Sequence, residues 1–418
     1  MLCMFLGSLQ LLHAESVTLD SFRKLAVMEN GRIKPFDTFA LNILKQFSGR
    51  AKLKGQKAYE WMARVVLAPE TTVQEKVFLI TNPEVLDSIG IKQAGKARDR
   101  YSYQQLLPGI NRLQMLVMSL SRRDAKQRGI IENEIIGLYN KIYVYRQLTH
   151  SFTFLDKHAV FSADIHANLP FTVIPVAGDQ KWISTWDSFI LNGKDIRKAK
   201  ELILLGKIHQ SFRAADQAGF DRAVSEFNRL ILGLNSDFSQ GKIDLEVFYN
   251  RLDPFYKAKF FFGFSVLFLL LSYMYFRKWF YRLSLLLLGG GFLLSLFGTV
   301  ARMIIRSRPP VTNLYETFIF TGLITALLGM LLEYFKKRNI GVLTGSLAGF
   351  VMLMIAGKYA AEGDTMGMLV AVLDSNFWLA VHVITIILGY AGIVLSGFIG
   401  HLYILQRIFK PKHESGLK

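Results

Sequence analysis

A single histidine interrupts the apolar run SNFWLAVHVITIILGY near the end of the chain. This residue, His382, follows Trp378 by four positions, which is about one helical turn. Tryptophan is enriched where a membrane meets water, and an ionisable group at membrane depth usually marks a functional site. We expect the imidazole just below one membrane face, where it either binds a ligand or bonds to a neighbouring helix. The sequence leaves both interpretations open.

No second histidine of this run can share a ligand with His382. His401 lies nineteen positions later, and a rise of about 1.5 Å per residue separates the two by about 28 Å. Four histidines of the polar half show no ligand spacing, and we expect them to have surface or capping roles: His150, His158, His166 and His209.

Three arginines gather at the end of another apolar run, at Arg302, Arg306 and Arg308. Arg302 and Arg306 are one helical turn apart. Their guanidinium groups could extend to lipid headgroups, or they could form a fork for the carboxylates of an anionic ligand. The spacing alone does not decide between these roles.

The segment RPPVTNLYETF follows these arginines directly. Pro309 and Pro310 predict the end of one helix. Asn313 followed by Glu316 predicts an N-cap with a reciprocal side-chain partner at the start of the next helix. This local interpretation needs no function.

Composition divides the 418 residues, with a net charge of +18, into a polar half and an apolar half. We predict a soluble domain over residues 15–256 and a membrane domain over residues 257–418. The only cysteine is Cys3, which excludes disulfides, cysteine zinc sites, iron–sulfur clusters and thioether attachment of haem to this chain. The stretch MLCMFLGSLQLLHA, residues 1–14, is typical of a signal peptide or an anchor.

Apolar runs of this length predict about five transmembrane helices: Ala258–Phe276, Leu283–Ile304, Leu314–Leu332, Ile340–Gly357 and Phe377–Leu402. Lysine and arginine are concentrated in the gaps after the first and third runs and after the fifth, which predicts that these ends face the cytoplasm. The soluble domain would then be extracytoplasmic. Small residues repeat every four positions in the fourth and fifth runs, and we expect close helix packing there.

The predicted fold is an α-helical membrane protein with a mostly helical extracytoplasmic domain that contains a few short strands. Helical periodicity covers Tyr59–Leu67, Ile110–Ser121, Ile131–Leu148 and Asp195–Leu234, and short strands are expected at Arg32–Pro35, Val77–Ile80 and Phe171–Val176. The basic residues of this domain are not interleaved with aromatic residues, so we expect no nucleic-acid partner.

RPPVTNLYETFIF closely resembles the start of the haem-handling core of the CcsA-type (system II) cytochrome c assembly family. LDSNFWLAVHV resembles the outward-facing histidine segment of that family. NGRIKPFDTFALNIL and LEVFYNRLDPF resemble the extracytoplasmic domain that precedes the core in some members. The likeness covers most of the chain.

This resemblance implies a protein of the inner (cytoplasmic) membrane, with its N-terminal domain on the periplasmic side, that presents haem b for attachment to apocytochrome c. His382 would be an axial ligand of the haem iron beside Trp378, and we infer that Arg302, Arg306 and Arg308 would meet the propionates. Expected partners are apocytochrome c, a CcsB/ResB-type assembly protein and membrane lipids.

The family also carries a tryptophan-rich (WWD) segment and a second outer histidine, and neither stands before Lys418. WISTWDSF, with Trp182, Trp186 and Asp187, precedes the first span and is interpreted as a chance likeness. We therefore expect half of a synthase, completed by a chain that carries the WWD segment. The alternative is a non-catalytic scaffold that binds no haem; a small transporter has no support from repeats or paired charges.

Overall fold

The computed structural model describes residues 17–93, 96–156, 162–166, 168–176, 178–179, 181–235, 239–274, 276–360, 363–367 and 377–409. The predicted signal peptide or anchor, Cys3 and His158 lie outside these residues. The chain forms two compact units, Met1–Gln240 and Gly241–Lys418. The division lies earlier than the predicted change after Tyr256, because helix α11 (Gln240–Leu252) places Tyr249 in the core of the second unit.

The first unit contains a four-stranded antiparallel sheet in the order β2-β1-β7-β8. Asn30 and Gly31 both have positive φ angles, 51° and 75°, in the two-residue turn between the first two strands, as a tight hairpin turn requires. The strands are β1 (Ala26–Glu29), β2 (Arg32–Pro35), β7 (Thr172–Pro175) and β8 (Trp182–Ser184). Two short ribbons complete the strands: β3 (Lys52–Leu53) with β4 (Gln56–Lys57), and β5 (Phe78–Ile80) with β6 (Asp99–Tyr101).

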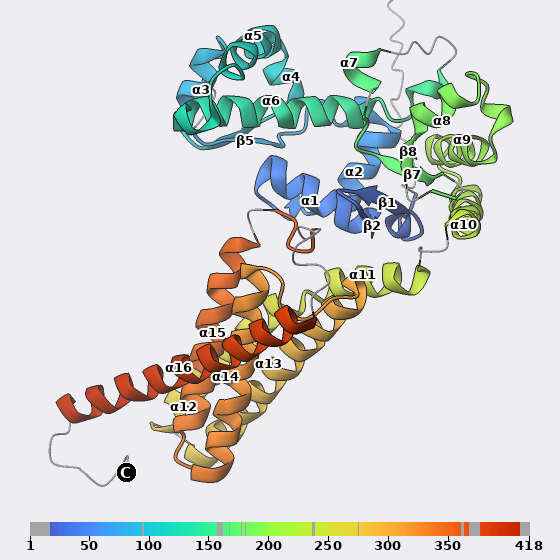
Figure 1. Ribbon diagram of the computed structural model, residues 1–418. Helices are drawn as coiled ribbons and strands as arrows, with labels where there is room; N and C mark the ends of the chain where they lie inside the picture. The colour runs from blue at the N-terminus through green and yellow to red at the C-terminus, as the bar shows by residue number, and fades with distance from the viewer. Residues whose placement is uncertain are drawn as a thin grey trace, which may run out of the picture. The chain divides into compact units, whose positions relative to one another are not determined.

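Helices make up most of the rest of this unit (Figure 1). They pack around a core of fully buried aromatic side chains that includes Phe36, Trp61 and Phe171. The α-helices are α1 (Phe36–Ser48), α2 (Ala58–Leu67), α3 (Pro83–Ser88), α4 (Tyr103–Leu106), α5 (Ile110–Leu120), α6 (Ile130–Thr149), α7 (Ala163–His166), α8 (Thr185–Leu191), α9 (Lys200–Arg213) and α10 (Gln217–Leu234).

The three predicted strands and three of the four predicted helices of this unit are confirmed to within one residue at each end. The predicted helical stretch Asp195–Leu234 forms two separate helices, α9 and α10. Ala215 has a φ of 54°, and the Asp216 side chain accepts a hydrogen bond from the Gly219 amide to cap α10. A capping aspartate after a left-handed residue starts a new helix rather than continuing the old one.

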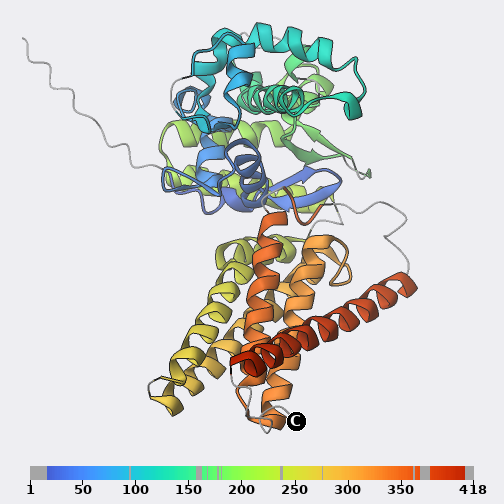
Figure 2. The ribbon, with the colours of Figure 1, turned by 90° about the vertical axis from the view of Figure 1, so that its left-hand side faces the viewer.

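Five helices of the second unit are long and apolar enough to cross a membrane. The predicted spans are confirmed as α12 (Pro254–Ser272), α13 (Arg277–Arg306), α14 (Leu314–Lys336), α15 (Ile340–Tyr359) and α16 (Phe377–Phe409). Most of them extend beyond the apolar runs because charged residues continue the helix at its ends. In both ribbon views α16 lies obliquely across the other spans (Figure 2).

Close packing through glycine is confirmed between α14 and α15. A Cβ atom on Gly329 would lie 2.6 Å from the Gly345 Cα atom, so any side chain there would push the helices apart. The same expectation fails for α16 within the described residues, since a Cβ atom on Gly392 or Gly400 would meet nothing within 4 Å. The sequence pattern is alike in the two helices, but only α15 has a facing backbone.

Candidate functional site

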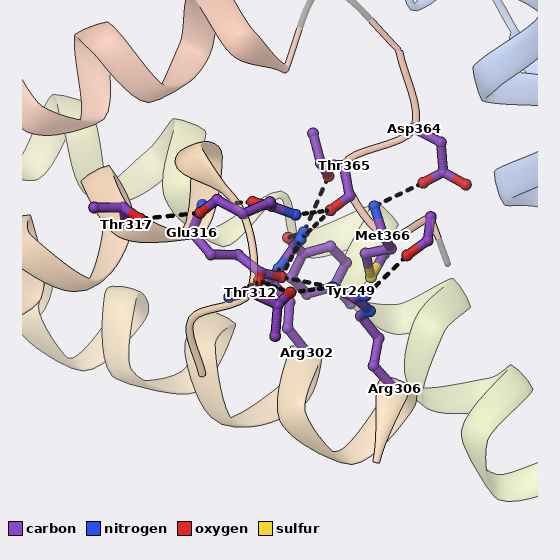
Figure 3. A network of polar contacts seen from close by, with 11 residues as sticks. Tyr249, Arg302, Arg306, Thr312, Glu316, Thr317, Asp364, Thr365 and Met366 are labelled. Atoms are coloured by element: carbon purple, nitrogen blue, oxygen red, sulfur yellow. Dashed lines mark hydrogen bonds and ion pairs between the residues drawn. The ribbon is translucent and has the colours of Figure 1, made fainter. Parts of the chain in front are cut away.

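The candidate site lies at the end of the helical bundle where α13 ends, α14 begins, α15 ends and α16 begins, and we call it the arginine end. Arg302 and Arg306 lie on the last turns of α13, and both donate to the Glu316 carboxylate of α14 (Figure 3). Arg302 Nη2 is 2.7 Å from Glu316 Oε1, and Arg306 Nη1 is 3.0 Å from the same oxygen. Only 4% of each arginine side chain and 5% of the Glu316 side chain are exposed. We call these three residues the arginine cluster.

The start of α14 holds the Glu316 carboxylate in place. Asn313 is the N-cap, as predicted, and its Oδ1 atom accepts from the Glu316 amide at 2.9 Å. The predicted reciprocal bond is wrong. Glu316 Oε2 accepts from the amide and hydroxyl of Thr312, at 2.9 and 2.6 Å, rather than from the Asn313 amide. The other oxygen is thereby left facing the two arginines.

Both arginines also reach the connection between α15 and α16. Arg302 Nη2 donates to the Thr365 carbonyl oxygen at 2.7 Å, and Arg306 Nη2 donates to the Gly367 carbonyl oxygen at 2.8 Å. Asn313 Nδ2 adds a third bond, 3.1 Å from the Thr365 oxygen. Met366, between these two residues, is 4% exposed and belongs to the bundle core. The segment Gly363–Gly367 is therefore bonded to both α13 and α14.

Two tyrosines surround the Arg302 guanidinium group. Tyr249 of α11 presents its hydroxyl 3.4 Å from Arg302 Nη1, and the Tyr315 ring centroid lies 4.9 Å from the guanidinium carbon. A cation over an aromatic ring is favourable, more so away from water. No role for Tyr249, Tyr315 or Thr365 was predicted from the sequence. The sequence offered one indication for two of them: Tyr249 and Tyr315 lie in segments that carry the family resemblance.

The predicted ligand residues are placed as follows. The guanidinium groups of Arg302 and Arg306 point at protein acceptors, so a ligand carboxylate would have to exchange with Glu316 or with the loop carbonyls. Arg308 is half-buried, two residues beyond the end of α13. Their predicted contact with an anionic ligand stays a prediction.

His382 lies on α16, five residues after Phe377, at the arginine end. Its side chain is exposed, and among the described residues it has no hydrogen-bond partner. The exposed His401 lies far along the same helix, where its Nδ1 atom is 2.7 Å from the Gly397 carbonyl oxygen. Trp378 belongs to α16, but its side chain lies outside the described set. Within the described ranges no three metal-ligating side chains gather at one point.

The WISTWDSF segment has structural partners inside the first unit. Trp186 is 1% exposed and donates through Nε1 to the His150 carbonyl oxygen at 2.9 Å. The Trp186 and His166 ring centroids are 4.0 Å apart. The Asp187 carboxylate accepts from the Ser184 hydroxyl at 2.7 Å to cap α8. These contacts explain the segment as part of the core.

Comparison with known proteins finds three similar relatives that carry the same name. No family model matches the chain. Cytochrome c biogenesis protein CcsA of Synechococcus sp. (strain JA-3-3Ab) is 33% identical over 97 residues, 23% of this chain and 28% of the relative. The CcsA protein of Coffea arabica is 32% identical over 105 residues, which are 25% of this chain and 32% of that protein.

The CcsA protein of Oenothera glazioviana is 32% identical over 92 residues, 22% of this chain and 28% of the relative. Over these stretches the chain is similar to CcsA-type cytochrome c biogenesis proteins. The chain spans about a third of the length of the curated CcsA relatives that it matches. With five apolar helices and relatives of this membrane family, it is a multi-pass membrane protein.

Proposed function

We propose that this CcsA-type chain acts in cytochrome c biogenesis and binds haem at the outer membrane face through His382, for attachment to apocytochrome c. The observation that carries the proposal is the exposed imidazole at the arginine end of a bundle whose relatives are named for cytochrome c biogenesis. A neutral imidazole is a common axial ligand of haem iron. The exposed side chain of His382 can approach the iron of a haem that lies beside α16.

Haem is the cargo of this reaction, and attachment joins its two vinyl groups to cysteine thiols of the apocytochrome. In the proposed mechanism this chain supplies orientation. His382 would bind the haem iron at one axial position. Apocytochrome c and a CcsB/ResB-type protein are further proposed partners.

The charge pattern supports an outward-facing arginine end. Cations cluster at the opposite end of the bundle, at Arg277, Lys278, Arg282, Lys336 and Lys337. Positive residues favour the cytoplasmic side, so we propose that the arginine end and the first unit lie on the periplasmic side of the inner membrane. Arg308, at the surface of this end, is the arginine for which we propose direct propionate contact.

Absorption spectroscopy of the purified full-length chain tests the proposal. We expect a Soret band after expression with adequate haem supply, and we expect His382→Ala to remove most of it. His401→Ala is the matched control, because His401 is exposed on the same helix but far from the arginine end. A Soret band that survives His382→Ala, or that depends equally on both histidines, would contradict the assignment.

The second candidate function is a membrane scaffold that binds no haem. It draws support from the pairing of Arg302 and Arg306 with Glu316, because the protein itself already engages these arginines. A protein that folds, inserts and remains colourless would favour this alternative.

A further inference from the structure

The arginine cluster does more than join two neighbouring helices. A simple α13–α14 ion pair would need one arginine and one carboxylate. Here two arginines share one oxygen of Glu316, and each also donates to a backbone carbonyl of the Gly363–Gly367 segment. Arg302 does so through the same Nη2 atom that it donates to Glu316, and Arg306 does so through its other terminal nitrogen. The carboxylate fixes the guanidinium planes, and the guanidinium groups hold the segment.

The bonded segment immediately precedes the stretch that leads into α16. Its carbonyl groups at Thr365 and Gly367 are held at 2.7 and 2.8 Å, and Met366 is packed into the core between them. Nine residues of the sequence lie between Gly367 and the first residue of α16, Phe377. The N-terminal end of α16 is therefore within nine residues of sequence of a point that the cluster fixes.

Burial strengthens the hydrogen bonds between the arginine cluster and the Gly363–Gly367 segment and restricts their geometry. Charge-assisted hydrogen bonds are stronger and more geometrically specific than neutral ones, above all where water is excluded. With 4–5% of each side chain exposed, loss of one partner would leave a charge without compensation in a buried place. The segment is expected to stay bound as long as all three members are present.

We propose that Arg302, Arg306 and Glu316 are positioning residues that hold the Gly363–Gly367 segment on the bundle and thereby restrict where α16 can present His382. This inference rests on the proposed function for its haem-related part. It assigns the two buried arginines to the protein's own carboxylate and loop carbonyls rather than to a ligand.

The first test needs no haem. In the full-length protein in detergent, Glu316→Gln removes the shared charge while keeping a similar shape. We expect amide hydrogen exchange in peptides that cover Gly363–Gly367 to become about tenfold faster or more, because local opening becomes easier. Exchange in this segment that equals that of the unchanged protein overturns the proposal.

Glu333→Gln is the matched control. Glu333 is also a buried glutamate of α14, 3% exposed, and it accepts a hydrogen bond from the Tyr281 hydroxyl at 2.7 Å at the opposite end of the helix. We expect this variant to leave exchange at Gly363–Gly367 unchanged. If it loosens the segment as much as Glu316→Gln does, the effect is general destabilisation and the proposal fails.

The second test follows the haem spectrum. Glu316→Gln and Arg302→Lys are expected to broaden or shift the His382-dependent Soret band and to speed haem loss to a scavenger about tenfold, whereas Glu333→Gln is not. Faster exchange with an unaltered band would overturn the positioning of His382. Absence of any His382-dependent band in the unchanged protein would instead overturn the proposed function, and the exchange result would still judge the attachment of the segment.

Discussion

Glu316 shows how one side chain can serve a helix start and a tertiary contact together. Its two carboxylate oxygens have different partners: Oε2 accepts hydrogen bonds from Thr312, and Oε1 accepts from the arginines. A local motif of Asn and Glu three residues apart explains the first role but not the second. The Glu316 carboxylate is thus oriented by Thr312 as well as by the arginines.

A residue-scale prediction concerns pH and the buried His166 of the first unit. Burial chiefly lowers the pKa of His166 below its ordinary 6.5, and the neighbouring His150 ring adds to this effect. The unfolded chain therefore takes up the proton at a higher pH than the folded chain. Stability of this unit is expected to fall as the pH drops through about 6.5 and to level off below the folded-state pKa.

Thermal unfolding of the full-length protein between about pH 8 and about pH 5 measures this dependence. His166→Gln keeps a polar side chain but cannot titrate, so its unfolding temperature should change less with pH. His209 also has a pKa lowered mainly by burial, and some pH dependence should remain in the variant. An identical pH dependence in both proteins would exclude His166 as a source.

At the scale of elements, the bundle combines close backbone contact with a few buried polar bonds. Ser265 of α12 lies 2.7 Å from Ser346 of α15 through their hydroxyl oxygens, and it donates to the Ser284 carbonyl oxygen of α13 at 2.8 Å. Small polar groups of this kind link helices where no water is present. Three spans are joined at this one point.

Glycine-to-alanine substitutions should affect stability differently at the α14–α15 contact and on α16. Gly329→Ala places a methyl group 2.6 Å from the Gly345 Cα atom, so we expect a loss of about 1–3 kcal/mol in stability from forced separation of the helices. Gly392→Ala makes the same chemical change on α16, where nothing lies within 4 Å, and should be neutral or slightly stabilising.

Unfolding temperatures of the two variants in the same detergent provide the measurement. Alanine favours a helix over glycine, so equal destabilisation by both changes would mean that something other than the Gly329–Gly345 contact sets the effect. A Gly329→Ala protein as stable as the unchanged one would contradict the packing at this contact.

At the scale of the whole molecule, the buried ion pairs of the arginine cluster change the difference in positive charge between the two ends of the bundle. Arg302 and Arg306 would oppose an outward arginine end if they were exposed cations. Both are buried against Glu316, so their charge is partly offset where it lies. The cations of the opposite end, such as Arg277 and Lys337, are therefore expected to determine the orientation of the chain in the membrane.

We predict that the C-terminus faces the cytoplasm and the first unit faces the other side. A reporter that is active only in the cytoplasm should be active when fused after Lys418 and silent when fused after Leu252. The reverse pattern would invert the proposed topology and would place His382 near the cytoplasmic face.

The sequence by itself determined the five spans, the N-cap at Asn313 and the family resemblance, because these depend on local composition and short spacing. It also placed Arg302 and Arg306 one turn apart on a single helix. It could not select their partner, since a guanidinium group binds a lipid phosphate, a ligand carboxylate or a glutamate equally well in principle.

Only the tertiary structure brought Glu316 and the Thr365 and Gly367 carbonyl groups to these arginines. The residues are 10 to 63 positions apart in the sequence, and their meeting depends on how α13, α14 and α15 pack. The same reason explains why similar glycine patterns gave a close contact in α15 and none for α16 within the described residues. A repeat of small residues permits close approach, but the position of the neighbouring helix decides whether the approach occurs.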